Sequence, residues 1–134
     1  MKNRAAGVAA SIVSTRTIRV LLVVALLLIS YLAFTPISTP VIDEFNDKFS
    51  HIAAFIVLAF LVDFSWPQTS WNLPKIAPLI GYGLLIEVVQ ALMPYRIFST
   101  WDLLADVLGL LIYPLLLPLL LRIPLIKRLR NDPA

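Results

Sequence analysis

The sequence predicts an all-α membrane protein, a bundle of four transmembrane helices with both termini in the cytoplasm. Hydrophobic residues make up 60% of the 134-residue chain and charged residues only 14%. A soluble domain of this length could not bury so much apolar surface, because small domains leave a large share of their surface exposed. Four apolar runs are each about long enough to cross a bilayer, and most cations fall on one side of the resulting topology.

The first apolar run, about residues 20–37, follows a basic segment at 1–19. A cleaved signal peptide is the alternative interpretation of residues 1–35, since it would also begin with a basic segment and an apolar core. The run ends in Phe34, Thr35, Pro36 and Ile37, which lack the small residues of a cleavage site. We therefore expect this run to be retained as the first transmembrane helix.

The other runs, at about 49–66, 76–93 and 103–121, complete a transmembrane domain at 20–121. Prolines interrupt the sequence between the runs, at Pro36, Pro40, Pro67, Pro74 and Pro94. Lipid offers the backbone no hydrogen-bond partners, so each run should be helical. The basic tail at 122–134 is expected either to lie on the inner lipid surface or to be solvated.

The distribution of Lys and Arg predicts the orientation in a bacterial inner membrane. Of the eleven cations, nine fall on one side: Lys2, Arg4, Arg16, Arg19, Lys75, Arg122, Lys127, Arg128 and Arg130. The positive-inside rule makes this side cytoplasmic, and only Lys48 and Arg96 lie outside. The outer loops are then about 38–48 and 94–101.

Several classes of function are excluded or unsupported. The chain has no cysteine, which excludes disulfides and thiolate metal sites. It also lacks a glycine-rich phosphate loop and the G-x-S-x-G motif of hydrolases. The positive charge lies at the ends of apolar runs and not in a nucleic-acid-binding patch. We assign no metal, no other cofactor and no nucleic-acid partner.

Polar residues from three of the four helices converge on the outer side, and these are the candidate ligand-binding residues. They are Asp47, Lys48, His51, Glu87, Gln90, Arg96, Ser99, Asp102 and Asp106. Residues three or four apart share a helix face, as His51 does with Asp47. At the inner side we expect no comparable cluster, with Asp63 at the membrane interface.

Three members of this set, His51, Glu87 and Asp106, lie about one turn or more inside the membrane. Glu87 precedes Pro94 by seven residues, which places it roughly 10 Å inside the outer end at helical rise. Ionisable groups at such depth are energetically expensive and mark functional sites, so these three are the candidate catalytic residues. Their alternative role is a hydrogen-bonded contact between helices. For Asp47, Asp102 and Ser99, capping of helix ends is the competing explanation.

Two glycines accompany the polar residues. Gly83 lies one turn from Glu87 on the same face, where a small residue allows another helix to approach, and Gly109 follows Asp106 by three residues.

The spacing of these residues resembles the VanZ-like family. The resemblance rests on Asp47-Lys48-x-x-His51, Glu87-x-x-Gln90 and Arg96-x-x-Ser99-x-x-Asp102-x-x-x-Asp106-x-x-Gly109. It covers roughly residues 43–121, and the first helix matches only in kind. Where this chain has Asp106, the family usually has Asn. The resemblance implies a cell-envelope context and an association with resistance to glycopeptides such as teicoplanin, without specifying a reaction.

Three hypotheses of function follow. In the first, the outer site binds or processes an envelope component: a lipid-linked precursor, a phospholipid headgroup or a glycopeptide, with an effect on glycopeptide tolerance. Lys48 and Arg96 would hold a phosphate or carboxylate, and His51 and Glu87 would relay protons or contact a sugar. In the second, the chain is a structural or assembly subunit whose polar residues connect helices. In the third, it is a membrane-embedded acid–base or metal-dependent enzyme.

Membrane lipids are expected partners, and four short helices also favour a homo-oligomer or a larger complex.

Overall fold

The computed structural model describes residues 14–36, 44–95 and 98–131. Its helices are α2 (Thr15–Phe34), α3 (Glu44–Ser65), α4 (Leu73–Ala91), α5 (Thr100–Leu120) and α6 (Pro124–Asn131). These ranges contain no strand. Four helices, α2 to α5, are long and apolar enough to span a membrane, which confirms the prediction of an all-helical chain with four such segments.

Each long helix begins about three to five residues before the apolar run that predicted it. The first turns contain polar residues, which hydropathy does not recognise as helical although they continue the same backbone hydrogen bonding. At α2, the Ser14 hydroxyl accepts a hydrogen bond from the Thr17 amide at 3.3 Å and caps the helix. Pro74, which we expected in the connection before the helix, lies in the first turn of α4, where a missing N–H breaks no helical bond.

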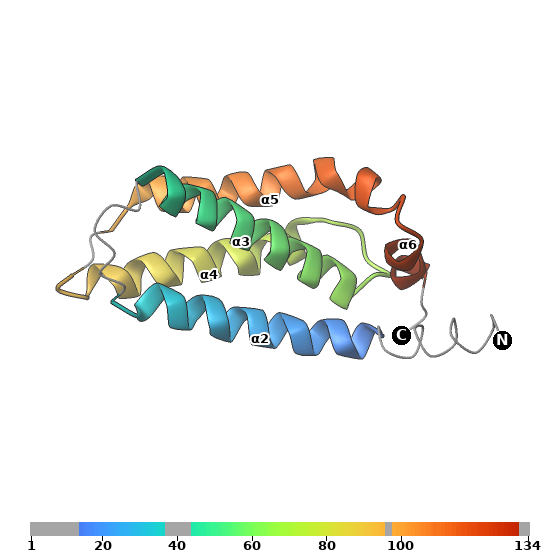
Figure 1. The fold of residues 1–134 in the computed structure, drawn as a ribbon, viewed down its shortest axis with the longest axis horizontal. Coiled ribbons are helices and arrows are strands. Elements are labelled where there is room, and N and C mark those ends of the chain that lie inside the picture. Colours follow the sequence, from blue (N-terminus) through green and yellow to red (C-terminus); the bar gives the residue numbers. More distant parts are fainter. Residues whose placement is uncertain (1–13, 37–43, 96–97, 132–134) are drawn as a thin grey trace.

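The four long helices form a bundle in which α2 and α5 lie on opposite sides, with α3 and α4 between them (Figure 1). Helix α3 packs most extensively against α5 and next against α2. Its side chains Phe55, Leu58 and Phe64 are almost completely buried and meet Tyr113 of α5 in the core. The most buried apolar layer of the protein therefore lies along α3.

Gly109 allows α3 and α5 to approach closely. A Cβ atom at this position would lie 2.6 Å from the Ile52 carbonyl oxygen and 2.9 Å from Phe55 Cβ, both in α3. These distances are shorter than normal van der Waals contacts of a carbon atom, so only glycine fits without a shift of the two helices. Gly109 thus determines how closely α3 and α5 can approach each other.

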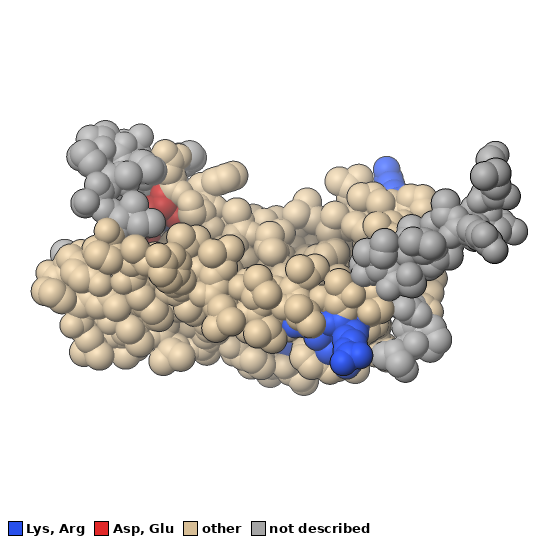
Figure 2. Space-filling model, turned by 60° about the horizontal axis from the view of Figure 1, so that its bottom comes forward, with Lys and Arg blue, Asp and Glu red and all other residues tan. Residues whose placement is uncertain are grey.

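The outer surface of the bundle is apolar along most of its length. Large side chains such as Leu27, Leu92 and Leu115 are more than 60% exposed. The face shown in Figure 2 is free of charged residues between a red area near one end and blue areas near the other. A surface of this kind is suited to lipid contact. We call the two ends of the bundle the His51 end and the Asp63 end, after a residue buried or half-buried at each.

Helix α6 follows the last long helix and lies against the Asp63 end of the bundle (Figure 1). Its Leu129 is buried in the common core, with 7% of its surface exposed, and Arg130 forms an ion pair with Asp63. We predicted that the tail either lies on the lipid surface or is solvated. Residues 124–131 form a helix that is docked on the bundle, an arrangement that neither alternative included.

Candidate functional site

The His51 end brings together polar side chains from three helices. Asp47, Lys48 and His51 lie in the first turns of α3, Glu87 near the end of α4, and Asp102 and Asp106 at the start of α5. Ser99 caps α5, since its hydroxyl accepts a hydrogen bond from the Asp102 amide at 3.3 Å. Arg96, one of the two cations that we expected on the outer side, lies outside the described residues.

His51 and Asp106 form the central pair of this end. The ring nitrogen Nδ1 of His51 lies 2.8 Å from Asp106 Oδ1, and the Asp106 side chain is almost completely buried. An ionised Asp106 makes Nδ1 the donor of this hydrogen bond, so that Nε2 carries the lone pair. The contact thus fixes the orientation of the imidazole and, for a neutral ring beside an ionised Asp106, also selects its tautomer.

Gly83 makes room for the Asp106 carboxylate. A Cβ atom at residue 83 would lie 2.6 Å from Asp106 Oδ2 and 3.1 Å from Phe55 Cζ. The sequence predicted that this glycine would admit a neighbouring helix, and the structure identifies the group that it admits.

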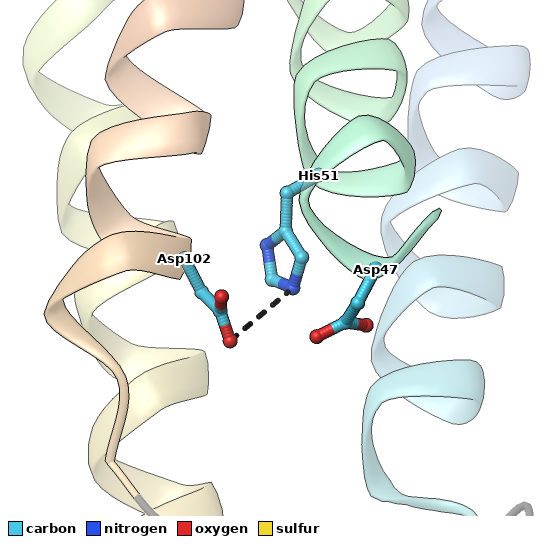
Figure 3. Close-up of side chains that lie close together, drawn as sticks. All are labelled: Asp47, His51 and Asp102. Carbon is cyan, nitrogen blue, oxygen red and sulfur yellow. Dashed lines mark ion pairs between the residues drawn. The ribbon is translucent and has the colours of Figure 1, made fainter. Parts of the chain in front are cut away.

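On the other side of the ring, His51 Nε2 faces the carboxylates of Asp102 and Asp47 (Figure 3). Asp102 Oδ2 lies 4.0 Å from Nε2, and Asp102 Oδ1 lies 3.9 Å from the Lys48 ammonium nitrogen. Both distances exceed those of hydrogen bonds. Asp102 Oδ1 is buried and has no hydrogen-bond partner. Asp47, His51 and Asp102 thus bring three potential ligand atoms within 4.8 Å of one another.

Glu87 is fully buried and supports the turn that precedes α5. Its Oε2 accepts a hydrogen bond from the Ser99 amide at 3.0 Å, whereas Oε1 has no hydrogen-bond partner. It also lies near enough to His51, Asp102 and Asp106 to interact with them electrostatically. One oxygen of Glu87 thus has a structural contact, and the other is an unused acceptor beside the cluster.

Gln90 is directed to another helix. Its side-chain nitrogen donates a hydrogen bond to the Ala33 carbonyl oxygen of α2 at 3.0 Å. Although three-residue spacing places Gln90 on the face of Glu87, its amide group connects α4 to α2.

The described members of the cluster carry more negative than positive charge. Four carboxyl groups, from Asp47, Glu87, Asp102 and Asp106, share this end with the basic side chains of Lys48 and His51. Such a set can bind a cation, accept hydrogen bonds from hydroxyl or ammonium groups, or transfer a proton through His51 Nε2.

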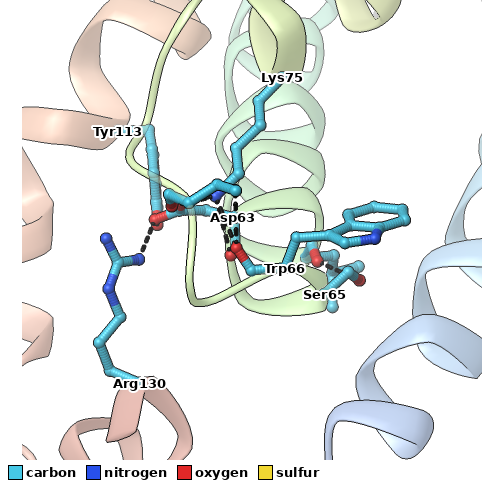
Figure 4. Close-up of polar contacts among 8 residues, drawn as sticks. Asp63, Ser65, Trp66, Lys75, Tyr113 and Arg130 are labelled. Atoms are coloured by element: carbon cyan, nitrogen blue, oxygen red, sulfur yellow. Dashed lines mark hydrogen bonds and ion pairs between the residues drawn. The ribbon is translucent and has the colours of Figure 1, made fainter. Parts of the chain in front are cut away.

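A second polar cluster, which the sequence did not predict, occupies the opposite end of the bundle. Asp63 is completely buried, and its two carboxylate oxygens bind three partners from different segments (Figure 4). Lys75 Nζ contacts Oδ1 at 2.6 Å, while the Tyr113 hydroxyl and Arg130 each donate to Oδ2 at 2.6 Å.

Lys75 is buried as well and makes further contacts in this cluster. Its ammonium group donates hydrogen bonds to the carbonyl oxygens of Asp63, Trp66 and Thr69, in addition to the Asp63 carboxylate. The expectation that no comparable cluster exists at this end is therefore wrong, and Asp63, which we expected at the membrane interface, is buried within the bundle. The available signal was the pair of opposite charges on either side of a short connection, Asp63 and Lys75.

With this geometry established, comparison with known proteins gives one match. A family model described as VanZ/LLP1 matches residues 9–121. The match includes α2, for which the family resemblance of the sequence was only in kind. It ends before α6. No curated protein and no solved structure matches the chain significantly.

Proposed function

The chain belongs to the VanZ/LLP1 family, and from this premise we propose that its His51 end binds or processes a cell-envelope component at the outer face of a bacterial inner membrane. One observation carries the proposal: Asp106 holds the His51 ring at 2.8 Å, and Nε2 faces a group of carboxylates at the end of the bundle. The ligand would be a lipid-linked precursor, a phospholipid headgroup or a glycopeptide, and its binding would alter glycopeptide tolerance.

The distribution of charge supports an outward-facing His51 end. Arg19, Lys75 and Arg130 all contact groups at the Asp63 end, through Ser65, Asp63 and neighbouring carbonyls. By the positive-inside rule, the end with the greater number of cations is cytoplasmic. Both described ends of the chain, near Ser14 and Asn131, then lie on the cytoplasmic side.

Cysteine labelling tests this orientation without interference, since the chain has no native cysteine. Thr100 and Gln68 are exposed positions at opposite ends of the bundle. In spheroplasts, a membrane-impermeant maleimide is expected to label Thr100→Cys fully and Gln68→Cys only after permeabilisation. The reverse labelling pattern would place the His51 cluster in the cytoplasm and overturn the proposed location.

The proposed site assigns different tasks to its residues. His51 Nε2 is the atom for proton transfer or hydrogen bonding, since Nδ1 is engaged by Asp106. Glu87 Oε1, an unpaired acceptor, would contact a hydroxyl or ammonium group of the ligand. Lys48, with Arg96 on the evidence of the sequence alone, would contact a phosphate or carboxylate.

Substitution of His51 and Glu87 tests the proposal. Cells with His51→Ala or Glu87→Gln are expected to show the glycopeptide susceptibility and envelope-lipid composition of cells that lack the protein. Leu92→Ala, at a position 81% exposed, is the matched control and should behave as wild type. Wild-type susceptibility and lipid composition in both site variants, at normal protein levels, would remove the His51 end from the mechanism.

A structural role is the second candidate, because two contacts of the same residues connect helices. His51 and Asp106 join α3 to α5, and Gln90 joins α4 to α2. Interhelical hydrogen bonds in membranes contribute about 1 kcal/mol each. The structural role predicts that Glu87→Gln and His51→Ala lower thermal stability and abundance together with the phenotype, whereas a ligand site predicts loss of phenotype at unchanged stability.

A further inference from the structure

We propose that Asp47, His51 and Asp102 bind a first-row divalent metal ion such as Zn²⁺ or Mn²⁺. The inference deepens the proposed function and rests on it for the ligand that the ion would hold, while binding of the ion itself is measured separately. One ligand atom from each residue lies within 4.8 Å of the other two.

The separation of the donor atoms fits a shared ion better than direct contact. His51 Nε2 and Asp102 Oδ2 are 4.0 Å apart, which is too long for a hydrogen bond. Two ligands that are each about 2.1 Å from an ion lie at most about 4.2 Å apart. The separation of 4.0 Å lies within this limit, so one ion can bridge Nε2 and Oδ2. At a tetrahedral angle the two atoms would lie about 3.4 Å apart, so Asp102 and the half-buried Asp47 would move toward the ion when it binds.

The His51 ring is oriented as a metal ligand usually is. Its Nδ1 pairs with the buried Asp106 carboxylate at 2.8 Å, which directs Nε2 toward Asp47 and Asp102. Metal-bound histidines commonly donate their second N–H group to a carboxylate, which fixes the ring and makes the ligating nitrogen more basic. Asp106 would thus be a positioning residue for the ion and not a ligand.

An independent observation at Asp102 points to a missing partner. Only 8% of this residue is exposed, and its Oδ1 is buried without a hydrogen-bond partner. An ionised carboxylate is stable in such surroundings when a cation or several donors compensate it. Lys48 approaches Oδ1 only to 3.9 Å and is one-third exposed, so it does not supply Oδ1 with a hydrogen bond.

The ligand set indicates the kind of ion and its use. One imidazole nitrogen and two carboxylate oxygens suit borderline to hard divalent ions and not Cu⁺, which prefers sulfur ligands. Three protein ligands leave at least one coordination position open. In the proposed function, a phosphate or carboxylate oxygen of the envelope component would occupy that position.

The test is titration of the purified full-length chain in detergent, freed of metal by a chelator, with Zn²⁺ or Mn²⁺ alone. The expected result is saturable binding of one ion per chain by wild type and by the exposed-position control Leu92→Ala. Asp102→Asn and His51→Gln should each bind at least tenfold more weakly while retaining the thermal stability of wild type. Should either variant fail to fold, the other decides, because each removes a different ligand.

Two results would overturn the inference: no saturable binding by wild type, or binding that is equal in wild type and in the ligand variants, which indicates an adventitious ion only. Neither result touches the proposed function, which is tested by the phenotypes of His51→Ala and Glu87→Gln. Conversely, ion binding that depends on Asp102, combined with wild-type phenotypes, would support the metal site and reject the envelope ligand.

Discussion

The Asp63→Ala variant is expected to lose about 3–5 kcal/mol of unfolding free energy, the typical result of removing one partner from a buried ion pair. The substitution leaves the ammonium group of Lys75 buried without its counter-ion, since only 6% of that residue is exposed. It also removes the acceptor of the Tyr113 hydroxyl and the anchor of Arg130. Unfolding of the purified protein in detergent, followed by circular dichroism, measures the difference.

Two milder variants serve as controls for this result. Tyr113→Phe removes one hydrogen bond to Asp63 and should cost about 1 kcal/mol. Arg130→Met should have an intermediate effect, because Lys75 and Tyr113 remain on the carboxylate and only the docking of α6 loses its ion pair. If Asp63→Ala destabilises the protein no more than Tyr113→Phe does, Asp63 is not the central residue of this end.

Gly109→Ala is expected to destabilise the bundle by about 1–3 kcal/mol, the usual effect of overpacking a core. The added methyl group would lie 2.6 Å from the Ile52 carbonyl oxygen and 2.9 Å from Phe55 Cβ. The carbonyl belongs to helical backbone and has little freedom to move, so α3 and α5 must separate. The same unfolding measurement applies, and separation of α3 from α5 should also lengthen the His51–Asp106 contact, which spans these helices.

Gly81→Ala is the matched control, because a Cβ atom at residue 81 would meet nothing within 4 Å. In α4 this change should be neutral or stabilise by up to about 1 kcal/mol, as alanine favours helices more than glycine does. Equal destabilisation by both substitutions would contradict the proposed role of close approach between α3 and α5.

Periodicity and topology together were sufficient to predict much of the His51 end. The helices are apparent because each apolar run is nearly long enough to cross a bilayer, and the spacing of Asp102 and Asp106 places both on one helix face. The alternation of helix direction then brings the polar ends of α3 and α5 together. Pairing within the set was not predictable, because periodicity gives the face of a side chain and not its rotamer. Gln90, which turns to α2, illustrates the difference.

The Asp63 cluster was missed for a different reason. A single carboxylate at the end of an apolar run has the same local sequence whether it faces solvent or is buried. Its partners Lys75, Tyr113 and Arg130 follow at separations of 12, 50 and 67 residues, which correspond to no helical or strand period. Only packing in three dimensions brings them to one carboxylate.

Asp106 shows how a departure from a family pattern acquires meaning from geometry. An asparagine at this position would still offer an oxygen to His51 Nδ1, so the orientation of the ring would be retained. The carboxylate of this chain adds negative charge to the same contact at 2.8 Å. We expect it to make Nε2 a better metal ligand.

The order in which the partners of Asp63 occur in the chain has a consequence for biosynthesis. Lys75 follows within 12 residues and is synthesised almost at once, but Arg130 is translated 67 residues after Asp63. Until α5 and α6 have been translated, Lys75 is the only one of these three partners available to the carboxylate. The nascent bundle completes its charge balance only when α6 has been translated, so the final docking step is expected to follow insertion of the long helices.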